Sequence, residues 1–277
     1  MKTSVVVSAY RRPDLVPAVL SRIARQLVRP DEVFYAEDGR DPAMAAALRT
    51  AAERLQLPVR HIRQPNPGPR KPTAVNRAVR HTTGDRLLFL DQDCLPNRFW
   101  LACHRLLGRP GVVLQGWRVH VRPRGVPAFL SHPFPVAHAL ARGELYPRHR
   151  LLPSCSTPPA ELERYEVLGC NLSLERSTFL AVGGYDEFYC GWGYEDTDLV
   201  IRLRNQGHRY RVAGGPIVVF HLDHPLQPRV GVESRKDACR QRREAGTVRP
   251  VSGLRAEPLA PAAPGASACY TAFDYAD

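Results

Sequence analysis

The stretch that decides the fold is Leu87-Leu88-Phe89-Leu90-Asp91-Gln92-Asp93, in which a short apolar run passes directly into two acidic residues. A continuous run of this kind is typical of a strand buried in a parallel sheet. Upstream, similar strand patterns occupy 3–9, 32–36 and 59–62, and helical patterns occupy 13–26, 41–55 and 72–82. Strands that alternate with helices indicate βαβ units. We therefore predict an α/β fold with a mostly parallel central sheet flanked by helices.

The chain beyond this stretch is less regular. Helices are predicted at 97–107 and 194–206, a strand at 112–121, ordered structure again at 168–174, and loops with short helices over the proline-rich 122–165. A strand at 217–220 is predicted to be the last one. We expect one domain in two halves, 1–120 and 121–247, and then a tail, 248–277, whose proline, alanine and glycine content predicts flexibility.

The composition is that of an ordinary globular protein, with 277 residues of which 44% are hydrophobic and 24% charged. No apolar run approaches the roughly 18 residues of a membrane helix, and the N-terminus lacks the pattern of a signal peptide. We therefore expect a cytoplasmic protein. The 7 cysteines include no CxxC pair, which argues against a zinc ribbon and favours free thiols.

The net charge of +12 has three competing explanations. Nucleic-acid binding, an anionic substrate or membrane surface, and arginine-rich solvated faces would each produce it. Arginine is abundant throughout while lysine is scarce, as a general compositional bias would give. No basic run is interleaved with aromatic residues, so we expect no nucleic-acid partner. Peripheral contact with the inner face of a membrane stays open.

Polar residues follow several predicted strands at the point where each strand ends. Ser8 to Arg12, Glu37-Asp38-Gly39 and Asp91-Gln92-Asp93 all hold such positions. In parallel sheets, ligands bind beyond the carboxyl ends of the strands. Two carboxylates at i and i+2 on an irregular segment can hold one divalent cation and leave positions open for phosphate oxygens. Solvated aspartates in a turn are the alternative for this motif alone.

The segment Cys190-Gly191-Trp192-Gly193-Tyr194-Glu195-Asp196-Thr197-Asp198 is more specific. Its glycines let the backbone pass close to a ligand, and a tryptophan between them offers a flat apolar face. The acidic residues begin a helix, where they could also serve as caps, but capping explains neither the Gly-Trp-Gly nor the Glu-Asp pair. His221 and His224 follow the strand at 217–220, and a neutral imidazole is a common metal ligand.

In these motifs the chain resembles the GT-A nucleotide-diphospho-sugar transferases, in particular glycosyltransferase family 2. The motifs that match in order are Ser-Val-Val-Val-Ser-Ala-Tyr-Arg-Arg-Pro at the N-terminus, Glu37-Asp38-Gly39, Asn76-Arg77-Ala78, Thr83-Gly84-Asp85 and Asp91-Gln92-Asp93. The later Gly-Trp-Gly-Tyr-Glu-Asp-Thr-Asp-Leu segment looks like that of a galactosyltransferase-type C-terminal half. The similarity covers roughly residues 3–225. It implies the GT-A fold, with 1–120 as the nucleotide-sugar half and 121–247 as the acceptor-binding and catalytic half.

The resemblance also implies roles for individual residues. Those near the donor or its nucleotide would be Ser8, Tyr10, Arg12, Glu37, Asp38, Lys71, Asn76, Arg77 and Asp91. A divalent metal, Mn²⁺ or Mg²⁺, would be bound by Asp93 and His221, with His224 as the fallback ligand and Asp91 near the ribose or the metal. Asp196 would be the general base, and Glu195, Trp192 and Gly193 would position the donor or acceptor sugar.

The reaction expected from this resemblance is transfer of a sugar from a nucleoside-diphosphate sugar to an acceptor hydroxyl, with inversion. A UDP-sugar is favoured over GDP- and dTDP-sugars, and the acceptor is a carbohydrate, a lipid-linked sugar or a small molecule. A retaining transferase on the same fold is one alternative, and a basic nucleic-acid-binding or scaffold protein is another. A nucleotidyltransferase would need a glycine-rich phosphate loop after the first strand, and residues 8–13 contain no glycine.

Overall fold

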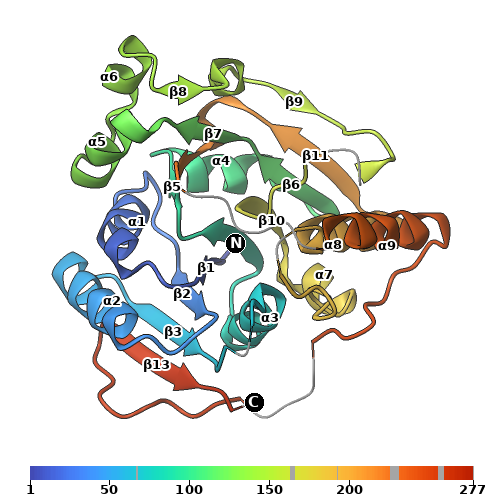
Figure 1. Ribbon diagram of the computed structural model, residues 1–277, viewed down its shortest axis with the longest axis horizontal. Coiled ribbons are helices and arrows are strands. Elements are labelled where there is room, and N and C mark those ends of the chain that lie inside the picture. The colour runs from blue at the N-terminus through green and yellow to red at the C-terminus, as the bar shows by residue number, and fades with distance from the viewer. Residues whose placement is uncertain (67, 163–165, 192, 225–230, 255–258, 277) are drawn as a thin grey trace.

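The computed structural model describes residues 1–66, 68–162, 166–191, 193–224, 231–254 and 259–276 (Figure 1). Its large sheet has the strand order β13 (Tyr270–Asp274), β3 (Val59–Arg63), β2 (Glu32–Glu37), β1 (Thr3–Ala9), β4 (Arg86–Asp91), β10 (Asn171–Glu175), β6 (Val112–Gly116), β11 (Arg209–Ala213) and β9 (Cys155–Ser156). The small sheet has the order β5 (Cys94–Pro96), β12 (Val219–Leu222), β7 (Arg118–Val121) and β8 (Leu145–Tyr146).

Helices lie on both faces of the large sheet. They are α1 (Val16–Ala24), α2 (Pro42–Leu55), α3 (Lys71–His81), α4 (Trp100–Leu107), α5 (Val126–Ser131), α6 (Val136–Ala141), α7 (Arg176–Ala181), α8 (Glu195–Asn205) and α9 (Val232–Glu244). Figure 1 shows α1 and α2 on one side of the N-terminal strands, with α3, α7 and α8 on the other. The α/β fold with a large, mostly parallel sheet flanked by helices is therefore confirmed.

The strand directions define one edge of the large sheet as the place for ligands. Neighbours from β13 to β4 pair in parallel, whereas β10 runs antiparallel to both β4 and β6. The carboxyl ends of β1, β2 and β4 consequently meet at the same edge. In register, Ser8 lies opposite both Ala36 and Asp91, and Ala9 lies opposite Glu37.

Alternation along the buried strands builds two hydrophobic cores, one on each face. In β1, Val5 and Val7 belong to the core beneath α1 and α2, and Val6 belongs to the core beneath α3 and α8. Because both faces are covered, these strands need apolar residues at every position, which is why their sequence does not alternate. No helix within the described ranges is long and apolar enough to cross a bilayer.

Two predictions about the strands were wrong. The strand predicted at 112–121 is divided into β6 of the large sheet and β7 of the small sheet. Gly116 ends β6 directly against the side chain of Asn171, which leaves no room for a Cβ atom at the bend. The strand at 217–220 is not the last, because β13 follows and pairs in parallel with β3. The region predicted to be a flexible tail thus contributes a strand beside β3 of the N-terminal half.

Candidate active site

The Asp91-Gln92-Asp93 turn leads from the large sheet into the small one, because β4 ends at Asp91 and β5 begins at Cys94. Its two carboxylates have different partners. Asp91 accepts a hydrogen bond from the Ser8 hydroxyl on the neighbouring strand. Asp93 turns toward β12 and its two histidines. One short turn therefore supplies an acidic side chain to each of two neighbouring clusters.

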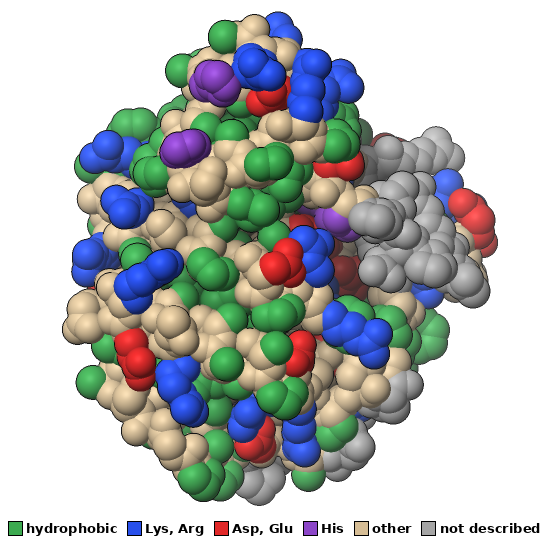
Figure 2. All heavy atoms as spheres, turned by 60° about the vertical axis from the view of Figure 1, so that its left-hand side comes forward, with side chains coloured by type: hydrophobic (Ala, Val, Ile, Leu, Met, Phe, Trp, Pro, Cys, Tyr) green, Lys and Arg blue, Asp and Glu red, His purple; other side chains and the backbone are tan. Residues whose placement is uncertain are grey.

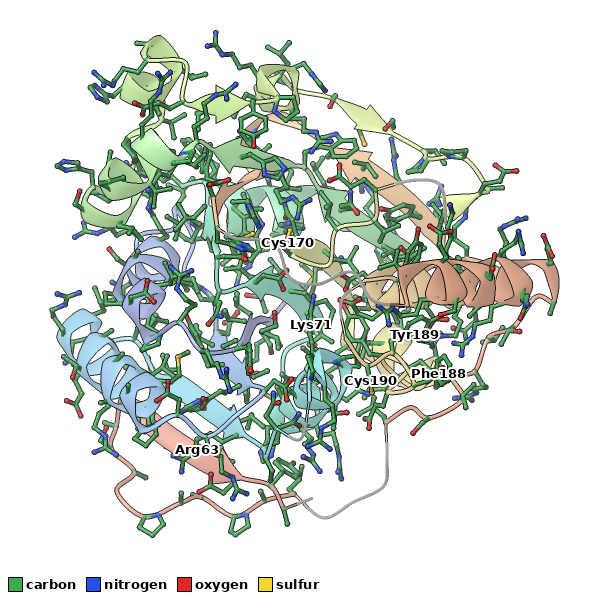
Figure 3. The ribbon with its side chains drawn as sticks, viewed as in Figure 1. Arg63, Lys71, Cys170, Phe188, Tyr189 and Cys190 are labelled. Atoms are coloured by element: carbon green, nitrogen blue, oxygen red, sulfur yellow. The ribbon has the colours of Figure 1, made fainter. Side chains whose placement is uncertain are left out.

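Lys71, the first residue of α3, is the centre of the first cluster, and Figure 3 labels it near the middle of the view. Its Nζ lies 3.2 Å from Asp91 Oδ1, 3.3 Å from Glu195 Oε1 and 3.5 Å from Asp196 Oδ2. Burial lowers the pKa of Lys71, but the three carboxylates outweigh it and raise that pKa well above its ordinary value. The ammonium group is therefore charged, and it joins the end of β4 to the start of α8.

The second cluster is a candidate metal centre formed by Asp93, His221 and His224. Their ligand atoms all lie within 4.8 Å of one another, and Asp93 Oδ2 is 3.0 Å from His224 Nε2 and 3.6 Å from His221 Nε2. The Nδ1 atom of His221 is buried without a hydrogen-bond partner among the described residues. One carboxylate with two imidazoles is a donor set that suits Mn²⁺ and other first-row divalent ions.

The electrostatics of Asp93 agree with a cation-binding role. Burial raises its pKa, but the hydrogen bond with His224 and the charges of His221 and His224 outweigh burial and lower the pKa to about 2. Cys94 also donates a hydrogen bond to Asp93 Oδ1 at 3.3 Å. The carboxylate is therefore ionised at neutral pH, as a metal ligand must be.

The start of α8 places the carboxylates of Glu195 and Asp196 beside Lys71. Tyr185 donates its hydroxyl to Asp196 Oδ1 at 2.8 Å, and Gly169 lies so close to this carboxylate that a Cβ atom there would collide with it. The Asp196 carboxylate is thus fixed from two sides. For Glu195, burial and the neighbouring Asp196 raise the pKa to about 7, against the opposing effect of Lys71.

A cavity of about 590 Å³ opens beside these clusters, at the ends of β1 and β2. It is lined by Tyr10, Arg11, Arg12, Pro13, Asp14, Glu37, Asp38, Gly39, Arg40, Asp41, Pro65 and Asn66. The set includes four of the residues predicted to bind the nucleotide. The cavity lies where the resemblance implies the nucleoside, and the four assignments stay predictions.

The two acidic residues at the end of β2 are not equivalent. Asp38 holds both ends of the segment between β3 and α3, since its Oδ1 accepts from Gln64 Nε2 at 2.8 Å and its Oδ2 accepts from the backbone of Arg70. Glu37 is 1% exposed, and its Oε2 lies 2.8 Å from His61 Nε2. Burial lowers the pKa of His61, although Glu37 opposes that change. Glu37 therefore lines the cavity with its carboxylate directed into the sheet.

Asn76 and Arg77 are buried and make contacts that brace the scaffold. Asn76 exchanges hydrogen bonds of 2.9 Å with the backbone of Tyr185, the residue that also holds Asp196. Arg77 donates to Gln64 Oε1 at 3.1 Å and lies over the ring of Tyr275. Neither contact involves the cavity, and the expected proximity to a nucleotide stays a prediction.

The glycine-rich segment before α8 is only partly described. Trp192, predicted to contact a sugar, lies outside the described residues. Gly191 and Gly193 adopt φ angles of 89° and 95°, and Tyr194 adopts 75°. Such left-handed backbone favours glycine, which explains both glycines of the motif.

Two known family models match this chain. The model of the family described as glycosyl transferase family 2 matches residues 4–142. The chain belongs to glycosyl transferase family 2. A second model, described as the N-terminal domain of galactosyltransferase, matches residues 150–224, which include Gly169, Glu195, Asp196 and His221.

Relatives of this family member include several sugar-transferring enzymes. Validoxylamine A glucosyltransferase of Streptomyces hygroscopicus subsp. limoneus is 28% identical over 228 residues, covering 74% of this chain and 48% of that protein. Chondroitin synthase of Pasteurella multocida strain Pm70 is 25% identical over 267 residues, covering 88% of this chain and 26% of that protein. The chain spans about half the length of the glucosyltransferase and about a quarter of the synthase.

Solved structures share the fold of this family member. A mannosyltransferase from Pyrobaculum calidifontis in complex with GDP-Man and Mn²⁺ matches with a TM-score of 0.54 at 22% identity, covering 91% of this chain and 65% of that one. The S. aureus TarS structure in complex with UDP has a TM-score of 0.59 at 17% identity, covering 81% of this chain and 61% of that one. Both likenesses show the GT-A fold.

Sequence reasoning missed several residues of this site in the family 2 chain. Tyr185 and Gly169 hold Asp196, and His61 pairs with Glu37. Gly169 had a usable signal, because a glycine within an otherwise apolar run indicates close approach of another group. Tyr185 and His61 had none, since their roles depend on contacts between segments distant in the chain.

Proposed function

We propose that this chain is a metal-dependent glycosyltransferase that moves a sugar from a nucleoside-diphosphate sugar to an acceptor hydroxyl, with inversion at the anomeric carbon. The observation that carries the proposal is the convergence on Lys71 of Asp91 from β4 and of Glu195 and Asp196 from α8. A candidate metal centre begins two residues after Asp91. Carboxylates so distant in the sequence meet here beside a cavity of the size of a small ligand.

The metal would be held by Asp93, His221 and His224, with Asp91 nearby. When bound, a divalent ion there would neutralise charge on the diphosphate of the donor. The Lys71 ammonium is a protein cation close to Asp91. It is placed to interact with the same phosphates or with the carboxylates that surround it. A UDP-sugar is our favoured donor, and GDP- and dTDP-sugars are the other candidates.

Asp196 is the proposed general base. Its carboxylate accepts the proton of the acceptor hydroxyl while that oxygen forms a bond to the anomeric carbon. The bond between this carbon and the donor's phosphate oxygen breaks, and its electron pair leaves with the nucleoside diphosphate. Tyr185 and Gly169 fix the carboxylate in one orientation, which supports a role that depends on position.

The test is turnover by Asp196→Asn with a nucleotide sugar found by screening UDP-, GDP- and dTDP-sugars with Mn²⁺. We expect turnover to fall by about 10²–10⁴, the usual contribution of a positioned base, while donor affinity is kept. Normal turnover would place the base elsewhere. The anomeric configuration of the product, determined by NMR, separates inversion from retention.

The metal assignment has its own test. Asp93→Ala should abolish the Mn²⁺-dependent part of nucleoside-diphosphate binding measured by calorimetry, because the variant loses the only carboxylate of the three-residue donor set. Asp85→Ala removes an acidic residue that lies outside this set and is the matched control. Equal affinities of wild type and Asp93→Ala would reject the ligand assignment.

A further inference from the structure

We propose that the small sheet carries the acceptor subsite, and that this subsite selects a carbohydrate acceptor bearing a negative charge. The inference rests on the proposed function, since it concerns the acceptor of that reaction. It begins from a row of residues that crosses the sheet away from the candidate metal centre. His221 on β12 is in register with His120 on β7, and His120 is in register with Tyr146 on β8.

The rings of these side chains form a continuous row, with one edge-type contact and one stacked contact. The rings of His221 and His120 are 5.1 Å apart at 67°, and those of His120 and Tyr146 are 5.1 Å apart at 18°. The guanidinium of Arg122 lies 4.8 Å from the centre of the Tyr146 ring. Because His120 and Tyr146 stack face to face, the polar edges of these two rings remain for other partners. Imidazole nitrogens and a phenol hydroxyl are suitable partners for the hydroxyl groups of a sugar.

Exposure increases along the row. The His221 side chain is 13% exposed, His120 is half-buried, and Tyr146 is 39% exposed. Neighbouring strands lie about 4.8 Å apart, so Tyr146 is about 10 Å from the metal centre. A ligand that reaches from the metal centre to Tyr146 must extend beyond the sugar unit that carries the reacting hydroxyl. The row therefore suits an acceptor with more than one ring.

The outer end of the row is strongly basic. Arg122 is exposed and makes no ion pair within the described ranges, and Arg124 and Arg142 lie nearby. The acidic group between them is Glu144, which is 2% exposed and lies 2.8 Å from Arg142 and 3.9 Å from Arg124. Figure 2 shows basic side chains, in blue, gathered at the top of the molecule, the region of α6 and β8 in Figure 1.

This imbalance indicates the charge of the ligand. One buried carboxylate cannot neutralise three guanidinium groups, so the rim keeps a positive field where the ring row ends. Guanidinium groups bind carboxylates and phosphates in a bidentate manner and do so more strongly than neutral hydroxyls. A sugar acid or a sugar phosphate placed over Tyr146 would meet Arg122. The shared feature of both is an anionic group one or two units from the reacting hydroxyl.

The experiment measures binding of paired probes by calorimetry to the full chain loaded with UDP and Mn²⁺. A hyaluronan tetrasaccharide is compared with neutral chitotetraose, and mannopentaose 6-phosphate with mannopentaose. We expect at least one acidic probe to bind about tenfold more tightly than its neutral partner, as one charge-assisted contact would give. The two pairs distinguish a carboxylate from a phosphate.

Variants locate the preference. Arg122→Gln should reduce the ratio of acidic to neutral affinity to near one, and Tyr146→Ala should weaken both members of the preferred pair. Arg209→Gln changes an exposed arginine at the amino end of β11, outside this rim, and should keep the preference. Equal ratios in Arg122→Gln and Arg209→Gln, or no acidic preference in the wild type, would overturn the inference.

The same samples separate this inference from the proposed function. If the wild type binds none of UDP, GDP and dTDP in the presence of Mn²⁺, the proposed function fails, and if it binds GDP or dTDP instead of UDP, the probes are measured with that nucleotide. If UDP binds and the acidic preference is absent, only the acceptor assignment fails. Circular dichroism of Tyr146→Ala shows whether weaker binding reflects lost contact or lost folding.

Discussion

Replacing Lys71 with methionine removes the cation that joins the two halves of the site. Methionine keeps the length and apolar stem of lysine but leaves Asp91, Glu195 and Asp196 facing one another without a counter-charge. We expect Lys71→Met to unfold at lower denaturant concentration than the wild type. We also expect weaker donor binding, because the carboxylates would then repel a diphosphate.

The magnitude follows from the three distances. At 3.2 to 3.5 Å and an effective dielectric constant of about 20, each Coulomb term is about 5 kcal/mol. Desolvation of Lys71 and repulsion among the carboxylates cancel most of this sum. Removing one partner of a buried ion pair usually costs about 3–5 kcal/mol. Since the Lys71 side chain is 27% exposed, a loss of about 2–3 kcal/mol in the free energy of unfolding is expected.

The assay is urea unfolding at pH 7 monitored by circular dichroism, without metal. Lys236→Met is the matched control. Lys236 is half-buried and its partner Glu233, at 3.8 Å, is exposed, so this pair is expected to contribute under about 1 kcal/mol. Lys71→Arg should be intermediate. If Lys71→Met and Lys236→Met unfold at the same urea concentration, Lys71 does not hold the carboxylates together and the reasoning is refuted.

Two further predictions concern the scaffold of the site. Gly169→Ala places a methyl group against the Asp196 carboxylate. We expect kcat to fall by about tenfold or more while the donor KM stays nearly unchanged. A change of equal size in kcat and in the donor KM would indicate general misfolding. Glu32→Gln concerns stability: burial raises the pKa of Glu32, but hydrogen bonds from Ser4 and Thr83 lower it from 4.5 to about 2. A carboxyl whose pKa is lower in the folded state stabilises the fold at every pH above its pKa in the unfolded chain. Glu32→Gln should therefore lower the free energy of unfolding by about 2–3 kcal/mol at pH 7. In denaturant titrations, the difference between wild type and variant should shrink as pH falls from 4.5 toward 2. A difference that stays constant over this range would contradict the assignment.

Much of the N-terminal half was predictable because its signals are local. The run Leu87–Leu90 and the β-branched 3–9 both require burial on two faces, and that requirement is visible in a single strand. Strand ends in parallel sheets then follow from topology, which is why Ser8 and Asp91 were expected on one edge and are in register.

The later half was less predictable because its order depends on contacts between distant segments. Gly116 packs against Asn171 at the bend. A glycine within a strand pattern can indicate such close approach, but it does not predict that the chain changes sheets there. β11 carries exposed Arg209 and Arg211 beside buried residues, and β13 is defined by its pairing with β3, which is distant in the sequence. α9 has a mostly polar sequence and is attached by Arg242, whose NH1 lies near two buried carboxylates, Asp186 and Asp198.

The division of the Asp-x-Asp motif between two sheets explains why its aspartates are not interchangeable. Asp91 is the last residue of β4, so its orientation is fixed by the large sheet and directed to Ser8 and Lys71. Asp93 precedes β5, so its orientation is fixed by the small sheet, where His221 is in register with Cys94. A side chain between them, Gln92, donates to the backbone of Tyr10 and holds the turn against the β1 loop. The first carboxylate is therefore coupled to α8, which carries the proposed base, and the second to the histidines, where the proposed acceptor row begins. The turn sets the distance between the two.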